Sequence, residues 1–452
     1  MSSLLAGLAQ KSITPPIGAS VAGYFEPHAA VEIINDLFAE ILILRSETGG
    51  QAALIDCDVI GLSEETVRKI RRQISTKTSF QPHEILISAT HTHTGPYTLD
   101  IFEGEADQDY LNFLEQEVLL GFEEALNNLQ PASLRITRTK VEKISCNRRV
   151  VFADGTVHTH ITEKDLDKIV GREGPVDQEL ILLEVAVRDS SPKIFLMNFP
   201  LHPTNVRGDR ICADFPGYLA EALEKQLHEK VISLFANGPC GNIDSKTPEL
   251  ETVAYGPERA RVIAEQIAGA ALQALPHCLP LPSAPISAAS ELVEIPLRHL
   301  SEEEIGWAQA VVSRGEPEDL FLTRGTCRPS LDKERVYAKE ILHLARMKKA
   351  SPTATLEVQG IRIGDLVIIG VPVELFCEFG LRIKEEGRRL FREVMVVELA
   401  NGFFGYVPTP QSFKAGGYET RTARSSQLAP EAGGRLCEAA ERLFRRLSGD
   451  RG

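Results

Sequence analysis

The segment Ile85-Leu-Ile-Ser-Ala-Thr-His91-Thr-His93-Thr-Gly-Pro96 joins a short apolar run to a His-x-His pair and a Gly-Pro turn. The run at 85–89 is typical of a buried strand, and ligands bind at the carboxyl ends of such strands. Residues two positions apart on an extended chain point to the same face. The pair therefore predicts one metal bound by both rings, or a metal-binding ring beside a ring that transfers protons. The alternative is two polar residues at a strand end without further function.

Similar apolar runs, bounded by Gly, Pro, Asp or Asn, predict further buried strands. They cover Glu40 to Arg45, Leu180 to Val187, Ile194 to Met197, Val231 to Ala236, Leu366 to Val371 and Met395 to Leu399. Longer stretches between them have the apolar spacing of amphipathic helices. These cover Glu64 to Ser75, Gln108 to Leu126, Tyr218 to His228, Glu258 to Leu275, Glu302 to Arg314, Lys333 to Lys349 and Pro430 to Leu447. The predicted fold class is mixed α and β, with β-sheets flanked by helices.

The composition is that of an acidic globular protein. The 452 residues include 49 Lys and Arg against 63 Asp and Glu, a net charge of −14, and 43% are hydrophobic. Basic residues form only short clusters such as Arg68 to Arg72, which excludes nucleic acid as a partner. No run approaches the ~18 consecutive apolar residues of a membrane span, and the first residues lack a secretion signal. We therefore expect a soluble cytoplasmic protein without a transmembrane segment. The oligomeric state is left open.

The eight cysteines are scattered without CxxC spacing. In a long chain without a secretion signal, this predicts reduced thiols rather than a disulfide framework or a cysteine zinc site.

One proline-rich segment, Leu275 to Ala288, interrupts the alternation of strands and helices. Four prolines crowd it, so it is neither a helix interior nor a central strand. It is a domain linker or a crossover. Because the candidate functional residues fall on both sides of it, we favour a crossover within one hydrolase domain spanning residues 1–452.

Two further residues follow apolar strands. His202 lies in Asn198-Phe-Pro-Leu-His-Pro, where a buried histidine bonded to the backbone is the alternative to a functional one. Glu374 ends the apolar run Ile368-Ile-Gly-Val-Pro-Val-Glu. A buried carboxylate needs a cation nearby, either a metal or an arginine. The second pair, His158 and His160, follows a hairpin signal and is interpreted as part of an exposed strand edge.

The loop Asn237-Gly-Pro-Cys-Gly-Asn-Ile-Asp is rich in glycine but lacks the Lys and Ser or Thr of a phosphate loop. The chain also has no G-x-G-x-x-G and no G-x-S-x-G, so neither nucleotide binding nor a serine hydrolase is supported. Cys240 in this loop is a candidate nucleophile, although a packed thiol is favoured.

Taken in order, these segments resemble the catalytic domain of the neutral/alkaline non-lysosomal ceramidase family. The resemblance rests on motifs spread over nearly the whole chain. They are Ile13-Thr-Pro-Pro-Ile-Gly-Ala-Ser-Val-Ala-Gly-Tyr, Asp36-Leu-Phe-Ala-Glu-Ile-Leu-Ile-Leu, Thr90-His-Thr-His-Thr-Gly-Pro, the His202 segment, Gly360-Ile-Arg-Ile-Gly-Asp-Leu through Glu374, Tyr406-Val-Pro-Thr and Gly417-Tyr-Glu.

The resemblance implies one zinc ion (Zn2+) and a set of residues around the reacting group. The implied ligands are His91, His202, Glu374 and Tyr406; the second set is His93, Arg148 and Tyr418. Zinc lowers the pKa of a bound water from 15.7 to about 7. His93 would protonate the leaving amine, while Arg148 and Tyr418 would face the developing oxyanion. Manganese and iron share enough ligand preference that residues alone do not choose the metal.

The chain departs from the family pattern at three points. Asp244 occupies the position of a serine in the ceramidase motif. There it either caps a helix or hydrogen-bonds the glycine-rich loop, or it faces the metal cavity and selects a cationic or hydroxylated substrate. The chain stops soon after Tyr418, so we expect no C-terminal β-sandwich domain, and it has no export signal. The leading hypothesis is a zinc hydrolase that cleaves a linear N-acyl amide in a soluble or lipid-like small molecule. A zinc-dependent ester or lactone hydrolase and a non-catalytic ligand-binding protein are the alternatives.

Overall fold

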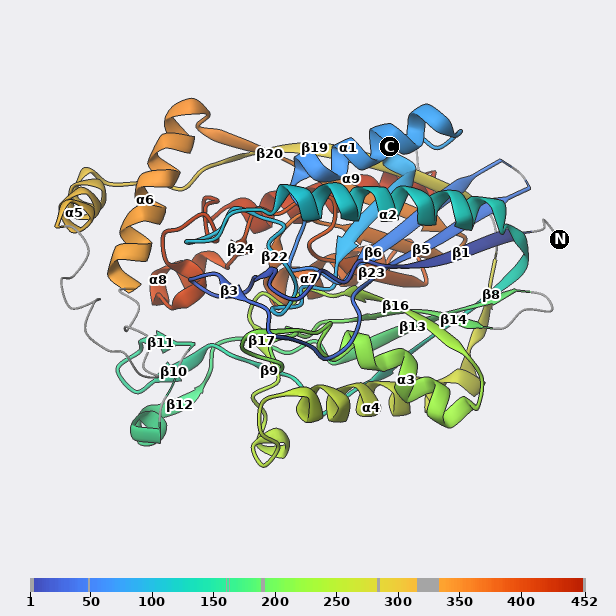
Figure 1. The fold of residues 1–452 in the computed structure, drawn as a ribbon, viewed down its shortest axis with the longest axis horizontal. Helices are drawn as coiled ribbons and strands as arrows, with labels where there is room; N and C mark the ends of the chain where they lie inside the picture. Colours follow the sequence, from blue (N-terminus) through green and yellow to red (C-terminus); the bar gives the residue numbers. More distant parts are fainter. Residues whose placement is uncertain are drawn as a thin grey trace.

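Two stacked β-sheets with helices on their outer faces make up the molecule (Figure 1). The computed structural model describes residues 4–449, apart from 48, 160, 162, 188–191, 283–284 and 315–332. In this part of the chain, the larger sheet has nine strands in the order β16 (Val231–Asn237), β14 (Lys193–Phe199), β13 (Glu179–Val187), β8 (Gln130–Lys140), β1 (Leu4–Ser12), β5 (Phe38–Ser46), β6 (Gln51–Cys57) and β7 (Ile85–Ala89), with β18 (Leu279–Leu281) paired to β8. The smaller sheet has the order β19 (Ile286–Pro296), β20 (Thr353–Ile363), β21 (Leu366–Gly370) and β23 (Glu393–Val397).

Strand periodicity produces the layers. In β5, Ile41 and Ile43 pack toward the helices, while Leu42 and Leu44 pack into the core shared by the two sheets. Successive side chains of a strand point to opposite faces, so a strand that is apolar on both faces must be covered on both. This requirement gives a four-layer arrangement of helices, sheet, sheet and helices.

Different helices cover different parts of the outer faces of the two sheets. α1 (Glu64–Lys77) and α2 (Gln108–Asn127) cover β5, β6 and β7, and α3 (Pro216–Leu227) and α4 (Pro257–Ala274) cover β13, β14 and β16. α7 (Cys377–Gly387) and α9 (Ala432–Ser448) cover the smaller sheet. α5 (Glu302–Ser313) packs on α6 (Lys333–Ala350) at one end of the molecule, where the short α8 (Pro410–Ala415) also lies (Figure 1).

Most predicted elements agree with the structure to within two residues at each end, and the mixed α and β class is confirmed. The helix start signals act as caps: Ser63 accepts a hydrogen bond from the backbone of Thr66, and Asp107 from that of Tyr110. None of the helices in the described ranges is both long and apolar enough to span a membrane.

The proline-rich segment begins with a 3₁₀ turn at Leu275–His277. β18 then pairs only with β8 and is therefore an edge strand. Pro280 is tolerated there because an edge strand does not need every backbone N–H group for pairing. The chain next enters the smaller sheet at β19, whose first residues, from Ile286, overlap the end of the predicted segment. The segment thus connects the two sheets, and the single-domain assignment stays a prediction.

Candidate metal centre

The centre forms where the two edges of the larger sheet approach each other. β7 and β16 lie at opposite ends of the strand order, yet they touch, and the side-chain amide of Asn237 after β16 donates to the Thr90 carbonyl after β7 at 3.2 Å. His91 follows β7, and His202 follows β14, the neighbour of β16. The curl of the sheet therefore brings loops from distant parts of the chain to one place.

His91 adopts a left-handed backbone conformation, with φ of 74°. The chain leaves the strand at Ala89, so the two histidines do not stand on extended chain as the sequence analysis assumed. The left-handed turn, uncommon for a residue other than glycine, directs their rings toward each other instead. Gly23 gives the space for this turn, because a Cβ on Gly23 would come within 2.6 Å of His93.

Three imidazoles present the same ring atom to a common point. The Nε2 atom of His91 lies 3.2 Å from Nε2 of His202 and 3.3 Å from Nε2 of His93. In each ring, Nδ1 lies 2.6 to 3.3 Å from a backbone carbonyl oxygen. Because a carbonyl oxygen only accepts, each Nδ1 carries a proton, which leaves Nε2 as the ring atom able to bind a metal.

Glu374 adds a carboxylate to the three rings. It lies in β22 (Glu374–Leu375), and its Oε2 atom is 3.3 Å from Nε2 of His91 and 3.9 Å from Nε2 of His202. This buried oxygen accepts no hydrogen bond from the described residues. Lone pairs that face one another without a donor are unfavourable unless a cation lies between them. Imidazole and carboxylate are ligands that zinc accepts, so these residues fit a zinc ion.

Tyr406 lies beside Glu374 because β22 pairs in parallel with β24 (Tyr406–Val407), which places the two residues opposite each other. Burial raises the pKa of Tyr406 well above its ordinary value, and Glu374 raises it further. Arg148 lowers this pKa by less than burial and Glu374 raise it, so the phenol stays protonated when no metal ion is bound.

The electrostatics of the rings favour the neutral form that binds metals. Burial lowers the pKa of His93 and of His202 well below the ordinary value, and the charges of His91 and Arg148 lower them further. Burial acts on His91 in the same direction, but Glu374 outweighs it and raises the pKa of His91. A metal replaces this proton, since it binds the deprotonated ring.

Glu398 hydrogen-bonds two segments of the centre, and this role was not predicted from the sequence. Its carboxylate accepts hydrogen bonds from the thiol of Cys240 at 2.8 Å, and from the backbone N–H groups of Cys240 and Leu375 at 3.0 Å each. It therefore links the loop whose carbonyl contacts His202 to the strand that carries Glu374. Burial and Glu398 raise the pKa of Cys240 well above its ordinary value, which agrees with a packed thiol rather than a nucleophile.

The glycine-rich loop packs directly on the strand of Glu374. A Cβ on Gly241 would come within 2.5 Å of the Glu374 carbonyl oxygen, and the Gly241 N–H donates to the Leu375 carbonyl at 3.0 Å. Glycine is therefore required for close approach, not for phosphate binding.

Arg148 reaches the centre from the other side through a buried ion-pair network. Its Nε donates to Glu419 at 2.8 Å and its Nη2 donates to the Gly241 carbonyl at 2.8 Å, while the guanidinium lies 5.5 Å from the centre of the Tyr406 ring. The second carboxylate oxygen of Glu419 accepts from Arg149 at 2.7 Å. Glu419 stands next to Tyr418 in one of the quoted motifs, but nothing in the sequence indicated that it bridges two arginines.

A cavity of about 850 Å³ opens beside the histidines. Its described lining includes His93, Arg148, His202, Asp244, Tyr406 and Tyr418. The structure thus brings the predicted site residues together around one space, and their individual roles stay predictions.

Asp244 lines the cavity and also accepts a backbone hydrogen bond, and its part in substrate selection stays a prediction. Its Oδ1 atom accepts from the Ser245 N–H at 2.6 Å, and its Oδ2 atom pairs with Lys246 at 3.0 Å on the cavity wall. Burial would raise the pKa of Asp244, but Lys246 and Arg148 outweigh burial and hold it below its ordinary value. The side chain is therefore a charged part of the lining.

His158 agrees with its structural interpretation. It is exposed at the end of β11 (Val157–His158) and stacks on Phe152, with 4.2 Å between ring centres, at the rim of the cavity. His160 lies outside the described residues.

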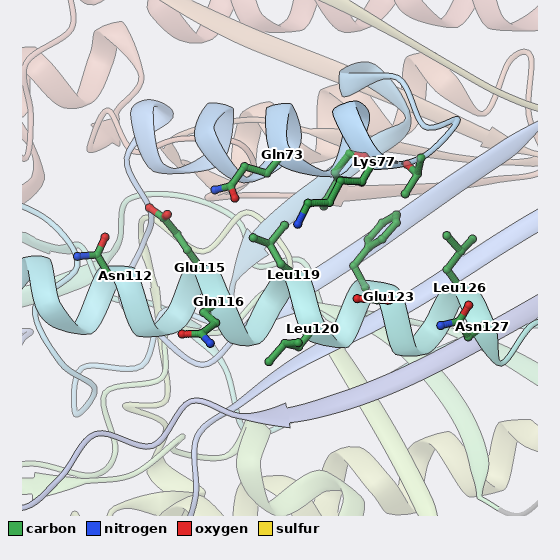
Figure 2. Close-up of a pocket in the computed structure, with 13 residues that line it drawn as sticks. Gln73, Lys77, Asn112, Glu115, Gln116, Leu119, Leu120, Glu123, Leu126 and Asn127 are labelled. Carbon is green, nitrogen blue, oxygen red and sulfur yellow. Dashed lines mark hydrogen bonds between the residues drawn. The ribbon is translucent and has the colours of Figure 1, made fainter.

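A separate groove of about 520 Å³ runs between α1 and α2 (Figure 2). Figure 2 shows Gln73 and Lys77 of α1 facing Glu115 and Leu119 of α2. The described residues that line it include no histidine or cysteine. It lacks the convergent ligand atoms of the histidine cluster, which is therefore the candidate centre.

Comparison with known proteins identifies relatives of the whole chain. The family profile described as neutral/alkaline non-lysosomal ceramidase, N-terminal, matches residues 4–252. Proteins named neutral ceramidase from Drosophila pseudoobscura pseudoobscura and Drosophila melanogaster are 22% and 21% identical to it; in each, the match covers 98% of this chain and 74% of the relative. The neutral ceramidase of Pseudomonas aeruginosa is 23% identical over 84% of this chain and 62% of its own length.

The crystal structure of neutral ceramidase from Pseudomonas aeruginosa superposes on this chain with a TM-score of 0.75. The match covers 99% of this chain and 75% of that chain at 18% identity. At this level of identity the likeness shows a shared fold.

Proposed function

The chain belongs to the neutral/alkaline non-lysosomal ceramidase family and is therefore a hydrolase of linear amides, and from this premise we propose that it cleaves an N-acyl bond with the help of one zinc ion. We assign zinc binding to His91, His202, Glu374 and Tyr406. The relatives carry the name neutral ceramidase, which makes an N-acyl amine the first substrate class to test.

One observation carries the proposal. Three Nε2 atoms and the Oε2 atom of Glu374 face one another in a buried site, and this Oε2 atom has no hydrogen-bond partner among the described residues. A structural cluster of histidines would be satisfied by hydrogen bonds, as buried polar groups generally are. The arrangement instead supports a bound cation at the inner end of a cavity large enough for a small-molecule substrate.

The residues around the cavity can each be assigned a step of amide hydrolysis. When bound, zinc would lower the pKa of a water molecule to about 7 and so supply a nucleophile at neutral pH. His93 lines the cavity, and its Nε2 is the ring atom able to accept a proton, since its Nδ1 lies 3.3 Å from the Gly23 carbonyl. This atom can accept a proton during attack and return it to the amine nitrogen that leaves.

We assign to Arg148 and Tyr418 the stabilisation of the amide carbonyl oxygen as negative charge develops on it. Arg148 keeps its charge because Tyr406, Glu419 and Asp244 outweigh the effect of burial and raise its pKa. The Tyr418 ring lines the cavity with its centre 5.8 Å from that of Tyr406. Donors fixed before the reaction act most strongly in such a site.

Metal removal tests the proposal directly. We expect the purified chain to contain about one equivalent of zinc by elemental analysis, because ligand atoms of His91, His202 and Glu374 lie within 3.9 Å of one another. Dialysis against a chelator should abolish hydrolysis of N-acyl amines, and zinc should restore it. Esters with the same acyl chain, assayed in parallel, separate amide from ester hydrolysis. A chain with bound zinc that binds N-acyl amines but hydrolyses none of them would contradict the proposal.

Replacing Asp244 by serine, the residue of the family motif, is expected to change the order of preferred substrates. The substitution removes the partner of Lys246 and so adds one net positive charge to the cavity lining. Relative kcat/KM for cationic, neutral and anionic N-acyl amines should shift toward the anionic ones. Asp244→Asn, which keeps the acceptor for the Ser245 N–H, serves as the matched variant. If neither variant changes the order of preferred substrates, Asp244 only hydrogen-bonds the loop and does not select substrates.

A further inference from the structure

The cavity lining is basic although the protein is acidic. Among the described residues of the lining, five side chains are basic and one is a carboxylate, Asp244. The basic ones are Arg148, Arg207, Lys246, Lys333 and Arg421. The whole chain has the opposite balance, 49 basic against 63 acidic residues. A cleft lined by one sign of charge raises the local concentration of ligands of the other sign.

These charges differ in how they are neutralised. The two deeper ones have carboxylate partners, because Arg148 pairs with Glu419 at 2.8 Å and Lys246 pairs with Asp244 at 3.0 Å. Arg207 and Arg421 are exposed at the mouth, and in the described part of the chain neither forms an ion pair with a carboxylate. The positive charge available to a ligand is therefore at the mouth.

Both mouth arginines are held by stacking on a tyrosine. The guanidinium of Arg421 lies 3.5 Å from the ring centre of Tyr337, and that of Arg207 lies 3.7 Å from the ring centre of Tyr255. Arg207 also donates through Nε to the Thr204 carbonyl at 3.3 Å. Stacking uses the flat face of a guanidinium. The edge N–H groups, apart from the Nε–H of Arg207, therefore remain available to bind a carboxylate or phosphate.

An aromatic wall lies beside the same mouth. Phe25 packs edge to face on Phe102 and on Tyr337, with ring centres 4.7 and 5.8 Å apart, and all three line the cavity. Aromatic rings bury an acyl chain well, since each offers a large apolar surface. The mouth thus combines an apolar wall with fixed cations.

We propose that the amide substrate is an anionic N-acyl amine, whose amine part carries a carboxylate or phosphate that Arg207 and Arg421 bind at the mouth. This assignment rests on the proposed function, because it deepens the substrate class of the same site. It separates this chain from an enzyme selective for uncharged lipid amides.

The test compares three substrates of one acyl length with the full chain and its metal. They are N-dodecanoylglycine, N-dodecanoylethanolamine and the phosphate ester of the latter. We expect kcat/KM to be at least roughly tenfold higher for an anionic substrate than for the neutral one. Comparing kcat/KM for the carboxylate substrate with that for the phosphate substrate shows which anion is preferred. Added salt should reduce the preference, since the mouth is exposed.

Arg207→Gln and Arg421→Gln are each expected to lower the ratio of anionic to neutral kcat/KM by roughly fivefold to tenfold. Arg68→Gln, on the exposed side of α1 away from the cavity, is the matched control and should leave the ratio unchanged. Equal ratios in the wild type and both mouth variants would overturn the proposal. Stimulation of the neutral substrate by anionic vesicles, without preference for soluble anions, would also overturn it and assign the arginines to a membrane surface.

Binding separates this proposal from the proposed function. A keto acid in which a methylene replaces the amide nitrogen of N-dodecanoylglycine cannot be hydrolysed as an amide. Calorimetry should show that it binds more tightly than the corresponding uncharged keto alcohol, and Arg421→Gln should reduce this difference. Such binding without hydrolysis of any amide would refute the proposed function alone. Hydrolysis of the neutral amide without an anion preference would refute the substrate class alone.

Discussion

Replacing His91 by alanine is expected to remove bound zinc and to lower the rate of amide hydrolysis by at least about a thousandfold. Loss of a residue that only orients a metal ligand costs about 10- to 100-fold, and loss of a ligand costs more. The Nε2 atom of His91 is the common neighbour of the cluster, within 3.3 Å of His93, His202 and Glu374. Its removal therefore leaves the remaining ligand atoms without a shared centre.

His93→Ala separates the two tasks assigned to the His-x-His pair. If His93 transfers protons, its variant keeps zinc and loses hydrolysis, whereas the His91 variant loses both. His277→Ala, at an exposed position in the 3₁₀ turn before β18, is the control and should retain both. Elemental analysis, kcat and thermal unfolding are measured on each. A His91 variant that is folded and retains both zinc and hydrolysis would remove the basis of the metal assignment.

The sequence predicted the elements well because their signals are local. The apolar run at 85–89 and the helical spacing of 108–126 each depend on burial within one segment, and both agree with the observed bounds of β7 and α2 to within one residue. The histidines, too, were found from position, since they follow strands. The geometric reason offered for their convergence was wrong, because His91 lies in a left-handed turn rather than on an extended chain.

The parts that the sequence did not predict depend on contacts between distant segments. The approach of β7 to β16 follows from the curl of a nine-stranded sheet, which no single strand encodes. Glu398 and Glu419 each bridge segments more than a hundred residues apart. The residues next to a buried, bridging glutamate in the sequence do not differ from those next to any glutamate at a strand end or in a turn. Only the fold shows that it is buried and which donors surround it.

Replacing Glu419 by alanine is expected to lower the free energy of unfolding by about 3 to 5 kcal/mol and to lower kcat as well. Glu419 is fully buried, with 0% of its side chain exposed, and accepts from Arg148, Arg149 and Thr159. Its loss leaves two buried guanidinium groups without their shared carboxylate. Because Arg148 also faces the cavity, the same change loosens the group that stabilises the developing oxyanion.

The pH dependence of stability should change with the same residue. Burial would raise the pKa of Glu419, but Arg148 and Arg149 outweigh burial and hold it below its ordinary value. A lowered pKa in the folded state stabilises the protein above the ordinary carboxyl pKa of about 4.3, and this stabilisation is lost as the pH falls toward the lowered pKa. The wild type should therefore lose stability below about pH 4.3, and Glu419→Gln should lack that part of the loss.

A matched control distinguishes the loss of stability from the loss of function. Glu357 pairs with buried Arg71 between β20 and α1, away from the cavity. Glu357→Ala should destabilise the fold through the same physical cause while leaving kcat close to the wild-type value at temperatures where both proteins are folded. Glu419→Ala should lower kcat under those conditions. If both variants lose stability and neither loses kcat, the Arg148 and Glu419 pair only supports the fold, and a group other than Arg148 must stabilise the oxyanion.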